Sequence, residues 1–107
     1  MYDGALKFME AAKHAMAAKD YFLQNESLVK AQKVVSELMS CLDMQQGGEI
    51  AANLFALYSY VGSELVQANV SENSDAIDRC IRVMSELRES WCAVEANLRN
   101  DRESHAA

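Results

Sequence analysis

Apolar residues recur at steps of three and four along four consecutive stretches of this 107-residue chain, and this spacing marks one face of an α-helix. Short polar or glycine-containing segments separate the stretches, and no segment shows the period of two that strands require. The pattern predicts an all-α single domain over residues 1–107, with helices at about 1–19, 21–43, 49–69 and 75–98 and a polar, frayed tail at 100–107. Short connections between consecutive helices favour an antiparallel up-down four-helix bundle.

The connections contain residues that start and stop helices. Asp20 is a candidate N-cap of the second helix. The segment Gln45–Gly48 is expected to end that helix, because its paired glycines supply a C-cap and a tight turn, and residues 71–75 are rich in capping side chains. The first helix is the shortest of the four, and it opens with apolar Met1 and Tyr2 without a capping residue before them. Such a helix lacks its first turns: either the numbered chain is a truncation, or part of the bundle is left uncovered.

The third predicted helix carries more apolar surface than a bundle core needs. Its core stripe runs through Ile50, Leu54, Leu57, Tyr58, Val61, Leu65 and Ala68. A second stripe, about 80° further round the helix at 100° per residue, consists of Ala51, Phe55, Gly62 and Val66. On the fourth helix, Val83 and Val94 lie along the flank of the core seam. A second stripe is a widened core, a dimer interface or a binding site for a guest helix, and the residues alone leave these three open.

Charge and cysteine content exclude several kinds of partner and environment. The formal net charge of −6 argues against nucleic acid or an anionic membrane as the main partner. The three cysteines are an odd number without close spacing, so they predict reduced thiols and neither a disulfide framework nor a zinc knuckle. No export signal and no run of about 20 apolar residues is visible, which predicts a cytoplasmic protein without membrane insertion.

Residues that could carry out catalysis do not gather in any recognisable pattern. Glu10 and His14 are one turn apart, but a single such pair falls far short of a metal site, and His105 lies in the polar tail. Glycine-rich nucleotide loops and nucleophile elbows are missing from the sequence. We therefore predict no catalytic residues, no cofactor and no metal, and a protein that is not an enzyme.

Five short motifs occur in a characteristic order along the chain. They are YDGALKF at 2–8, KAQKVVSEL at 30–38, GGEIA at 47–51 followed by Asn53-Leu54, LYSY at 57–60, and ELRESW at 86–91. In this order and spacing they resemble the flagellar secretion chaperone family FliS, the flagellin chaperones of bacteria. The resemblance covers nearly the whole chain, from Tyr2 to Trp91.

The resemblance implies a cytoplasmic four-helix chaperone that works without nucleotide hydrolysis. Members of the family bind the C-terminal segment of flagellin, which is disordered in the free monomer and helical in the filament. They thereby prevent premature polymerisation and present the subunit to the flagellar export gate. We expect the guest to lie beside the third and fourth helices, anchored by Ala51, Phe55, Tyr58, Gly62 and Val66, with Val83 and Val94 on the neighbouring wall. The alternative is a structural or regulatory bundle that homodimerises through the same apolar stripe.

One departure from the family pattern concerns the start of the first helix. The family has a segment before Tyr2 that begins this helix and can fold over the guest site in the unbound chaperone, and the numbered sequence lacks it. If the chain is this short, part of the core is exposed, and self-association or occupation by a neighbour's helix is expected. A start codon assigned too far downstream, with Met1 an internal methionine, is the simpler explanation.

Overall fold

The structure, a computed structural model, describes residues 2–42 and 47–106, and the side chains of these residues as far as residue 90. It contains four helices: α1 (Tyr2–Ala17), α2 (Tyr21–Ser40), α3 (Gly48–Ser71) and α4 (Ser74–Ala106). The all-α prediction is confirmed, and α1 is the shortest helix with 16 residues. The fourth helix continues to Ala106, past its expected end near residue 98 and through the expected tail, because no glycine or proline after Ser74 stops it.

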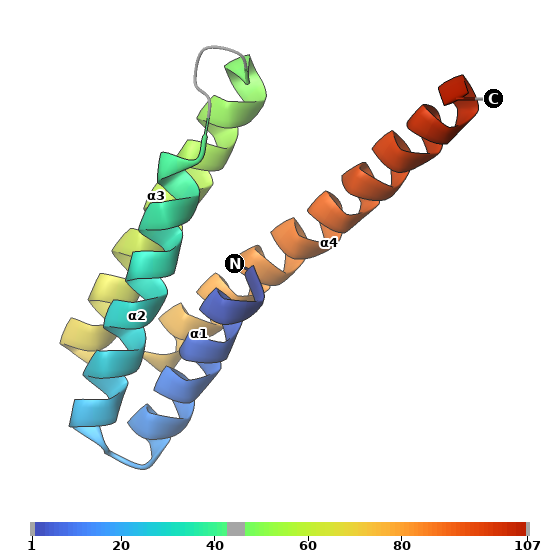
Figure 1. Cartoon of the computed structure of the whole chain (residues 1–107). Helices are drawn as coiled ribbons and strands as arrows, with labels where there is room; N and C mark the ends of the chain where they lie inside the picture. The colour runs from blue at the N-terminus through green and yellow to red at the C-terminus, as the bar shows by residue number, and fades with distance from the viewer. Residues whose placement is uncertain (1, 43–46, 107) are drawn as a thin grey trace.

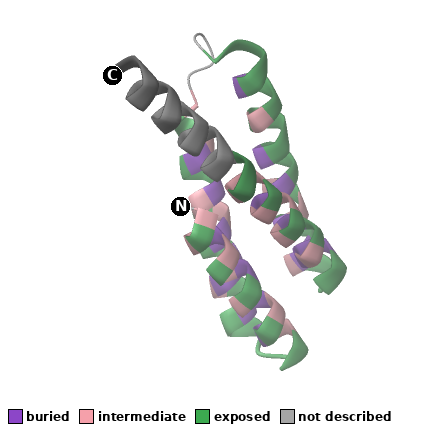
Figure 2. Ribbon diagram, turned by 90° about the vertical axis from the view of Figure 1, so that its right-hand side faces the viewer, coloured by how far each residue is buried: buried purple, intermediate pink, exposed green. Residues whose placement is uncertain are grey.

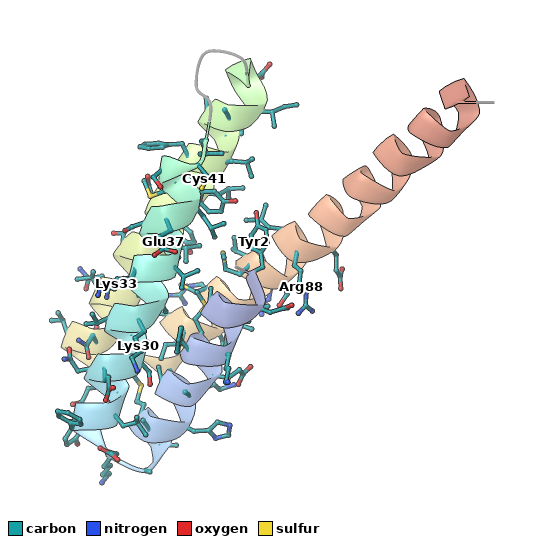
Figure 3. The ribbon with its side chains drawn as sticks, viewed as in Figure 1. Tyr2, Lys30, Lys33, Glu37, Cys41 and Arg88 are labelled. Atoms are coloured by element: carbon teal, nitrogen blue, oxygen red, sulfur yellow. The ribbon has the colours of Figure 1, made fainter. Side chains whose placement is uncertain are left out.

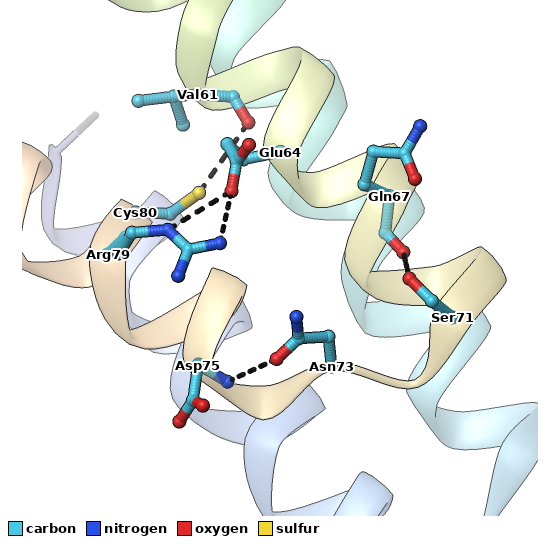
Figure 4. Close-up of polar contacts among 8 residues, drawn as sticks. All are labelled: Val61, Glu64, Gln67, Ser71, Asn73, Asp75, Arg79 and Cys80. Carbon is cyan, nitrogen blue, oxygen red and sulfur yellow. Dashed lines mark hydrogen bonds and ion pairs between the residues drawn. The ribbon is translucent and has the colours of Figure 1, made fainter.

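Two of the three connections are built as the capping residues predict. The Asp20 side chain accepts a hydrogen bond from the Leu23 N–H at 3.2 Å and caps α2. Glu72 ends α3 in the left-handed conformation, and Asn73 Oδ1 accepts a hydrogen bond from the Asp75 N–H at 3.0 Å (Figure 4).

The glycine pair differs from the expectation. Cys41 is the C-cap of α2, in the right-handed conformation, and its N–H bonds to carbonyls of the last turn. Gly47 instead lies at the N-cap of α3, and Gly48 has a positive φ of 53°. The glycines therefore start α3, because the chain must change direction there and glycine tolerates that conformation. The rest of the expected Gln45–Gly48 turn, at residues 45 and 46, lies outside the described residues.

Each helix packs against two neighbours, so the four form a ring around one core. Contacts join α1 with α2, α2 with α3, α3 with α4, and α4 with α1, as expected for an up-down bundle (Figure 1). The side chains of the three-four stripes fill the centre, and buried residues gather on the sides of the helices that face it (Figure 2). The largest fully buried side chains are Met9, Leu28, Leu65, Ile77 and Met84. Burying a side chain of this size contributes about 1.5–3 kcal/mol, so these residues account for much of the stability.

Helix α1 covers the core only up to the level of its own first turn, at Tyr2 and Asp3. Two contacts mark this level: the hydroxyls of Tyr2 and Tyr58 are hydrogen-bonded, and Arg88 Nη1 lies 2.8 Å from Asp3 Oδ1. Tyr2 and Arg88 lie near each other where α4 begins to lean away from the α2–α3 pair (Figures 1 and 3). Beyond this level the predicted core stripe of α3 is not fully buried, since Ile50 and Leu57 are exposed.

A short series of amides joins α2 to α3. Gln24 is 2% exposed, and its Nε2 donates to Asn69 Oδ1 at 3.1 Å. Asn69 Nδ2 donates in turn to Asn25 Oδ1 at 2.8 Å. Gln24 Oε1 is buried and has no hydrogen-bond partner among the described residues. The amides align the two helices, but a buried carbonyl without a partner costs free energy.

Replacing the buried amide therefore tests what it contributes. We expect Gln24→Leu to leave the free energy of unfolding unchanged or to raise it by about 1 kcal/mol, because it removes a buried oxygen without a partner. Asn25→Ala, which removes only the exposed member of the series, is the control. Urea unfolding followed by circular dichroism measures both, and a loss above about 2 kcal/mol for Gln24→Leu would show that the amide, through its bond to Asn69, contributes more than its unpaired oxygen costs.

Candidate partner-binding surface

Helix α3 is almost free of charge although much of it faces solvent. Between Ile50 and Ser71, Glu64 is the one charged residue. Six of the ten large apolar side chains exposed among the described residues belong to this helix: Ile50, Phe55, Leu57, Tyr60, Val66 and Val70. A helix face that meets only water normally carries charged residues, whereas the centres of protein interfaces are depleted of them. The composition of α3 is therefore typical of a helix that another protein covers.

Hydrogen bonds show which neighbour lies on each flank of α3. The bond from Asn69 to Asn25 marks the flank toward α2. On the other flank Arg79 Nη2 lies 2.9 Å from a Glu64 carboxylate oxygen, and the Cys80 thiol donates to the Val61 carbonyl at 3.6 Å, both toward α4 (Figure 4). Residues seven apart share one face of a helix, so every exposed residue of α3 can be assigned to a flank.

Three of the predicted anchors share the flank toward α2. Phe55 and Gly62 lie at steps of seven from Asn69, and Val66 lies one turn before it. Phe55 and Val66 are 43% and 47% exposed. Apart from the adjacent residues and the nearby backbone of α3, no atom of the described residues comes within 4 Å of a Cβ built on Gly62. A partner backbone could approach closely at this glycine.

Helix α2 adds apolar residues to the same flank. The antiparallel pairing set by Asn25 and Asn69 brings Val29 opposite Val66, and the half-buried Met39 opposite Phe55. Val29 is 44% exposed. We call the set Val29, Met39, Phe55, Gly62 and Val66 the α2–α3 surface.

The remaining predicted anchors lie elsewhere. Ala51 and Tyr58 are buried in this structure, at 3% and 2% exposure, and the Tyr58 hydroxyl bonds to Tyr2. Val83 is half-buried and packs against the core. It comes from α4, on the opposite side of α3 from Phe55 and Val66, so it is not the neighbouring wall for them. Val94 lies in the part of α4 whose side chains are outside the described residues.

Sequence reasoning missed two groups of exposed or half-buried apolar residues. The first group, Val29 and Met39, belongs to α2. The signal for it in the sequence was the polar pair Asn25 and Asn69 beside the apolar stripes, which marks the flank of α3 that faces α2. Ile50, Leu57 and Tyr60 line the α4 flank of α3, with exposures of 70%, 38% and 42%. The first two had been predicted as core, because a three-four stripe does not reveal where its cover ends.

The opposite side of the bundle, formed by α1 and α4, is polar. Lys13 Nζ lies 2.7 Å from Asp78 Oδ1, and the hydrogen bond to this carboxylate raises the pKa of Lys13. Arg88 pairs with Asp3 at the other end of α1. Exposed pairs of this kind add little stability, about 0–1 kcal/mol each. The charged side chains of these pairs keep the α1–α4 side hydrated, whereas α3 exposes apolar side chains to solvent.

Helix α2 carries its own charged residues away from the α2–α3 surface. Lys30, Lys33 and Glu37 follow one another along the helix toward Cys41, its C-cap (Figure 3). Lys30 forms an ion pair with Glu26 at 3.1 Å and lies over the Phe8 ring at 5.8 Å from its centre.

Groups that could bind a metal or act as a nucleophile are sparse. Within the described residues, no three His, Cys, Asp or Glu side chains come together. Burial raises the pKa of the Cys80 thiol to about 12, so at neutral pH it is protonated and poorly nucleophilic. None of the helices, as far as they are described, is long and apolar enough to cross a membrane.

The contrast between Cys80 and Cys41 can be measured. Cys41 is exposed and Cys80 is fully buried. At pH 8 we expect iodoacetamide to alkylate Cys80 more than about a hundredfold more slowly than Cys41, because only the thiolate reacts. Mass spectrometry of peptides gives both rates, and in concentrated urea the two should become similar. Equal rates in the folded protein would contradict the burial of Cys80.

Fold and surface together define an all-α bundle of the protein-interaction class. The sequence matches the family described as "Flagellar protein FliS" over residues 1–98, and the chain belongs to this family. The flagellar secretion chaperone FliS of Vibrio cholerae is 31% identical over 97 residues, 91% of this chain and 71% of that protein. Those of Bacillus subtilis and Salmonella typhimurium are 31% and 34% identical, covering 95% and 85% of this chain and 75% and 68% of their own lengths. The resemblance expected from the five motifs is confirmed.

Proposed function

We propose that this protein is a cytoplasmic export chaperone that binds the C-terminal segment of flagellin as helices along α3. The observation that carries the proposal is the nearly uncharged α3, with six large apolar side chains exposed on it. Membership of the FliS family and the names of its relatives, flagellar secretion chaperones, support an export role over a catalytic one.

Physical chemistry favours this kind of guest. A segment that is disordered when free loses entropy on folding, so its affinity must come from apolar anchors laid on a preformed surface. Phe55 and Val66 are eleven residues apart, which is about 16 Å or three helical turns. A guest helix of that length would place residues at i, i+3, i+4 and i+7 against them and against Val29. Gly62, between the two anchors, would let the guest backbone come close.

Binding of this kind would serve export in two ways. A covered C-terminal segment is not available to pack against other flagellin subunits, so polymerisation is delayed. The complex also remains a substrate for the flagellar export apparatus, because the chaperone holds the guest by surface contacts that separate without chemistry.

Two anchor substitutions test the proposal. We expect Phe55→Asp and Val66→Asp to weaken binding of a flagellin C-terminal peptide by about tenfold or more, because each places a charge where an apolar side chain is buried by the guest. Isothermal titration measures the Kd, and urea unfolding measures the stability of each variant. Leu23→Asp is a matched control, since Leu23 is also 43% exposed but lies at the start of α2, outside the α2–α3 surface.

Three outcomes would count against the proposal. Absence of binding by the unsubstituted chain at micromolar peptide would exclude flagellin as the guest. Equal loss of binding and of folding stability would show that Phe55 and Val66 belong to the core. A stable dimer that Phe55→Asp dissociates would favour the alternative, a bundle that homodimerises through the α2–α3 surface.

A further inference from the structure

The two most exposed large apolar side chains of the described residues lie at one end of the α2–α3 pair. Phe22 is 80% exposed and Val70 is 78% exposed. Phe22 belongs to the first turn of α2 and Val70 to the last turn of α3. Because the two helices are antiparallel, these two turns lie at the same end of the bundle. Neither side chain is part of the core, and neighbouring apolar side chains left in water mark a surface that a partner covers.

Phe22 continues the apolar residues of α2 beyond the α2–α3 surface. It precedes Asn25 by three residues and Val29 by seven, so the three side chains project from one side of the helix. The bond from Asn69 to Asn25 identifies this side as the one that faces α3. Leu23 precedes Asn25 by two residues and therefore lies on nearly the opposite side of α2.

Val70 continues the apolar residues of α3 in the same direction. It follows Val66 by four residues, which is one helical turn, and it is adjacent to Asn69. From Phe55 to the end of α3 at Ser71 is about 24 Å, compared with about 16 Å from Phe55 to Val66. The exposed apolar residues of the α2–α3 pair therefore extend to the end of the pair.

An amide pair interrupts this longer row of apolar residues. Asn69 has partners for both of its amide atoms, since Oδ1 accepts from Gln24 Nε2 and Nδ2 donates to Asn25 Oδ1. The Nδ2 group of Asn25 differs, because nothing in the part of the chain that the structure describes accepts a hydrogen bond from it. Asn25 therefore presents two N–H donors at the surface, with apolar residues on either side of it along the row.

A guest helix that covers the whole row has to pass over Asn25. An apolar guest residue at this level would remove water from the two N–H donors and replace none of their hydrogen bonds, which weakens binding. A guest side chain with an accepting oxygen replaces those bonds. A buried polar contact of this kind fixes the register of a helix against its neighbour, as a single Asn does in the core of a coiled coil.

Building on the proposed function, we propose that the guest helix continues past Val66 to Phe22 and Val70 and places a hydrogen-bond acceptor against Asn25 Nδ2. The acceptor is the side chain of an Asn, Gln, Ser, Thr, Asp or Glu of the guest. Apolar guest residues three or four positions before and after it contact the two parts of the row. Asn25 is thus a specificity-determining residue, which sets the register of the guest.

Titration with a flagellin C-terminal peptide tests the length of the contact. We expect Phe22→Asp and Val70→Asp each to raise the Kd about tenfold or more, because each places a charge where the guest buries an apolar side chain. Leu23→Asp is the matched control, since it adds the same charge in the same turn of α2 as Phe22→Asp but on the side away from α3, and it should leave the Kd unchanged. Circular dichroism verifies that all three variants fold.

The variant Asn25→Asp tests the acceptor. Its carboxylate can still accept the hydrogen bond from Asn69 Nδ2, but it has no N–H to donate to the guest. We expect the Kd to rise about tenfold or more relative to Leu23→Asp, which carries the same added charge.

Replacing each polar residue of the peptide by alanine in turn identifies the acceptor. Loss of the acceptor should weaken binding to the unsubstituted chain about fivefold or more, and it should not weaken binding to Asn25→Asp further, because the hydrogen bond is already absent there.

Two results would overturn this inference and leave the proposed function intact. In the first, Phe55→Asp weakens peptide binding but Phe22→Asp and Val70→Asp do not, so the guest ends before the amide pair. In the second, Asn25→Asp leaves the Kd unchanged or lowers it, so no acceptor faces Asn25. A peptide that does not bind the unsubstituted chain would overturn the proposed function, and this inference with it.

Discussion

Every helix in this bundle contributes an apolar stripe to the core, and this core stripe is buried only where the other three helices surround it. This requirement explains most of the architecture. Where all four helices are present, side chains such as Leu28, Leu65 and Ile77 are completely buried. Where α1 has not yet begun, the same pattern of residues leaves Ile50 exposed. Among the described residues, the core is therefore the part of the chain that all four helices enclose.

The polar contacts refine an arrangement that apolar burial produces. The amides of Gln24 and Asn69 align α2 with α3, while Arg79 and Glu64 join α3 to α4. Surface ion pairs contribute little to the free energy of folding, but they select one pairing of helices among several of similar apolar area. Apart from Glu64, α3 carries no charged residue between Ile50 and Ser71. Its two flanks therefore differ in their neighbours, α2 and α4, and in the apolar residues that they expose.

The sequence allowed the four helices, the Asp20 cap and the buried stripe at Val61, Leu65 and Ala68 to be predicted, because local periodicity determines these features. It did not allow the flanks to be assigned. A helical wheel places Phe55 and Val83 at angles around their own axes, but which helix lies at each angle depends on the order of helices in the ring. The burial of Ala51 and the exposure of Leu57 were missed for a related reason, since both depend on which neighbouring helix lies beside each residue of α3.

The uncharged surface of α3 also has a kinetic consequence. Charged partners attract one another over distances up to about a Debye length, which raises association rates at low salt. An interface built on Phe55, Val66 and Val29 offers no such attraction. Association there should proceed near the rate of unsteered encounters, about 10⁵–10⁶ M⁻¹s⁻¹, and should vary little with ionic strength. Glu64 is the one charged residue of α3 between Ile50 and Ser71, so a partner is selected there by the fit of apolar side chains after contact.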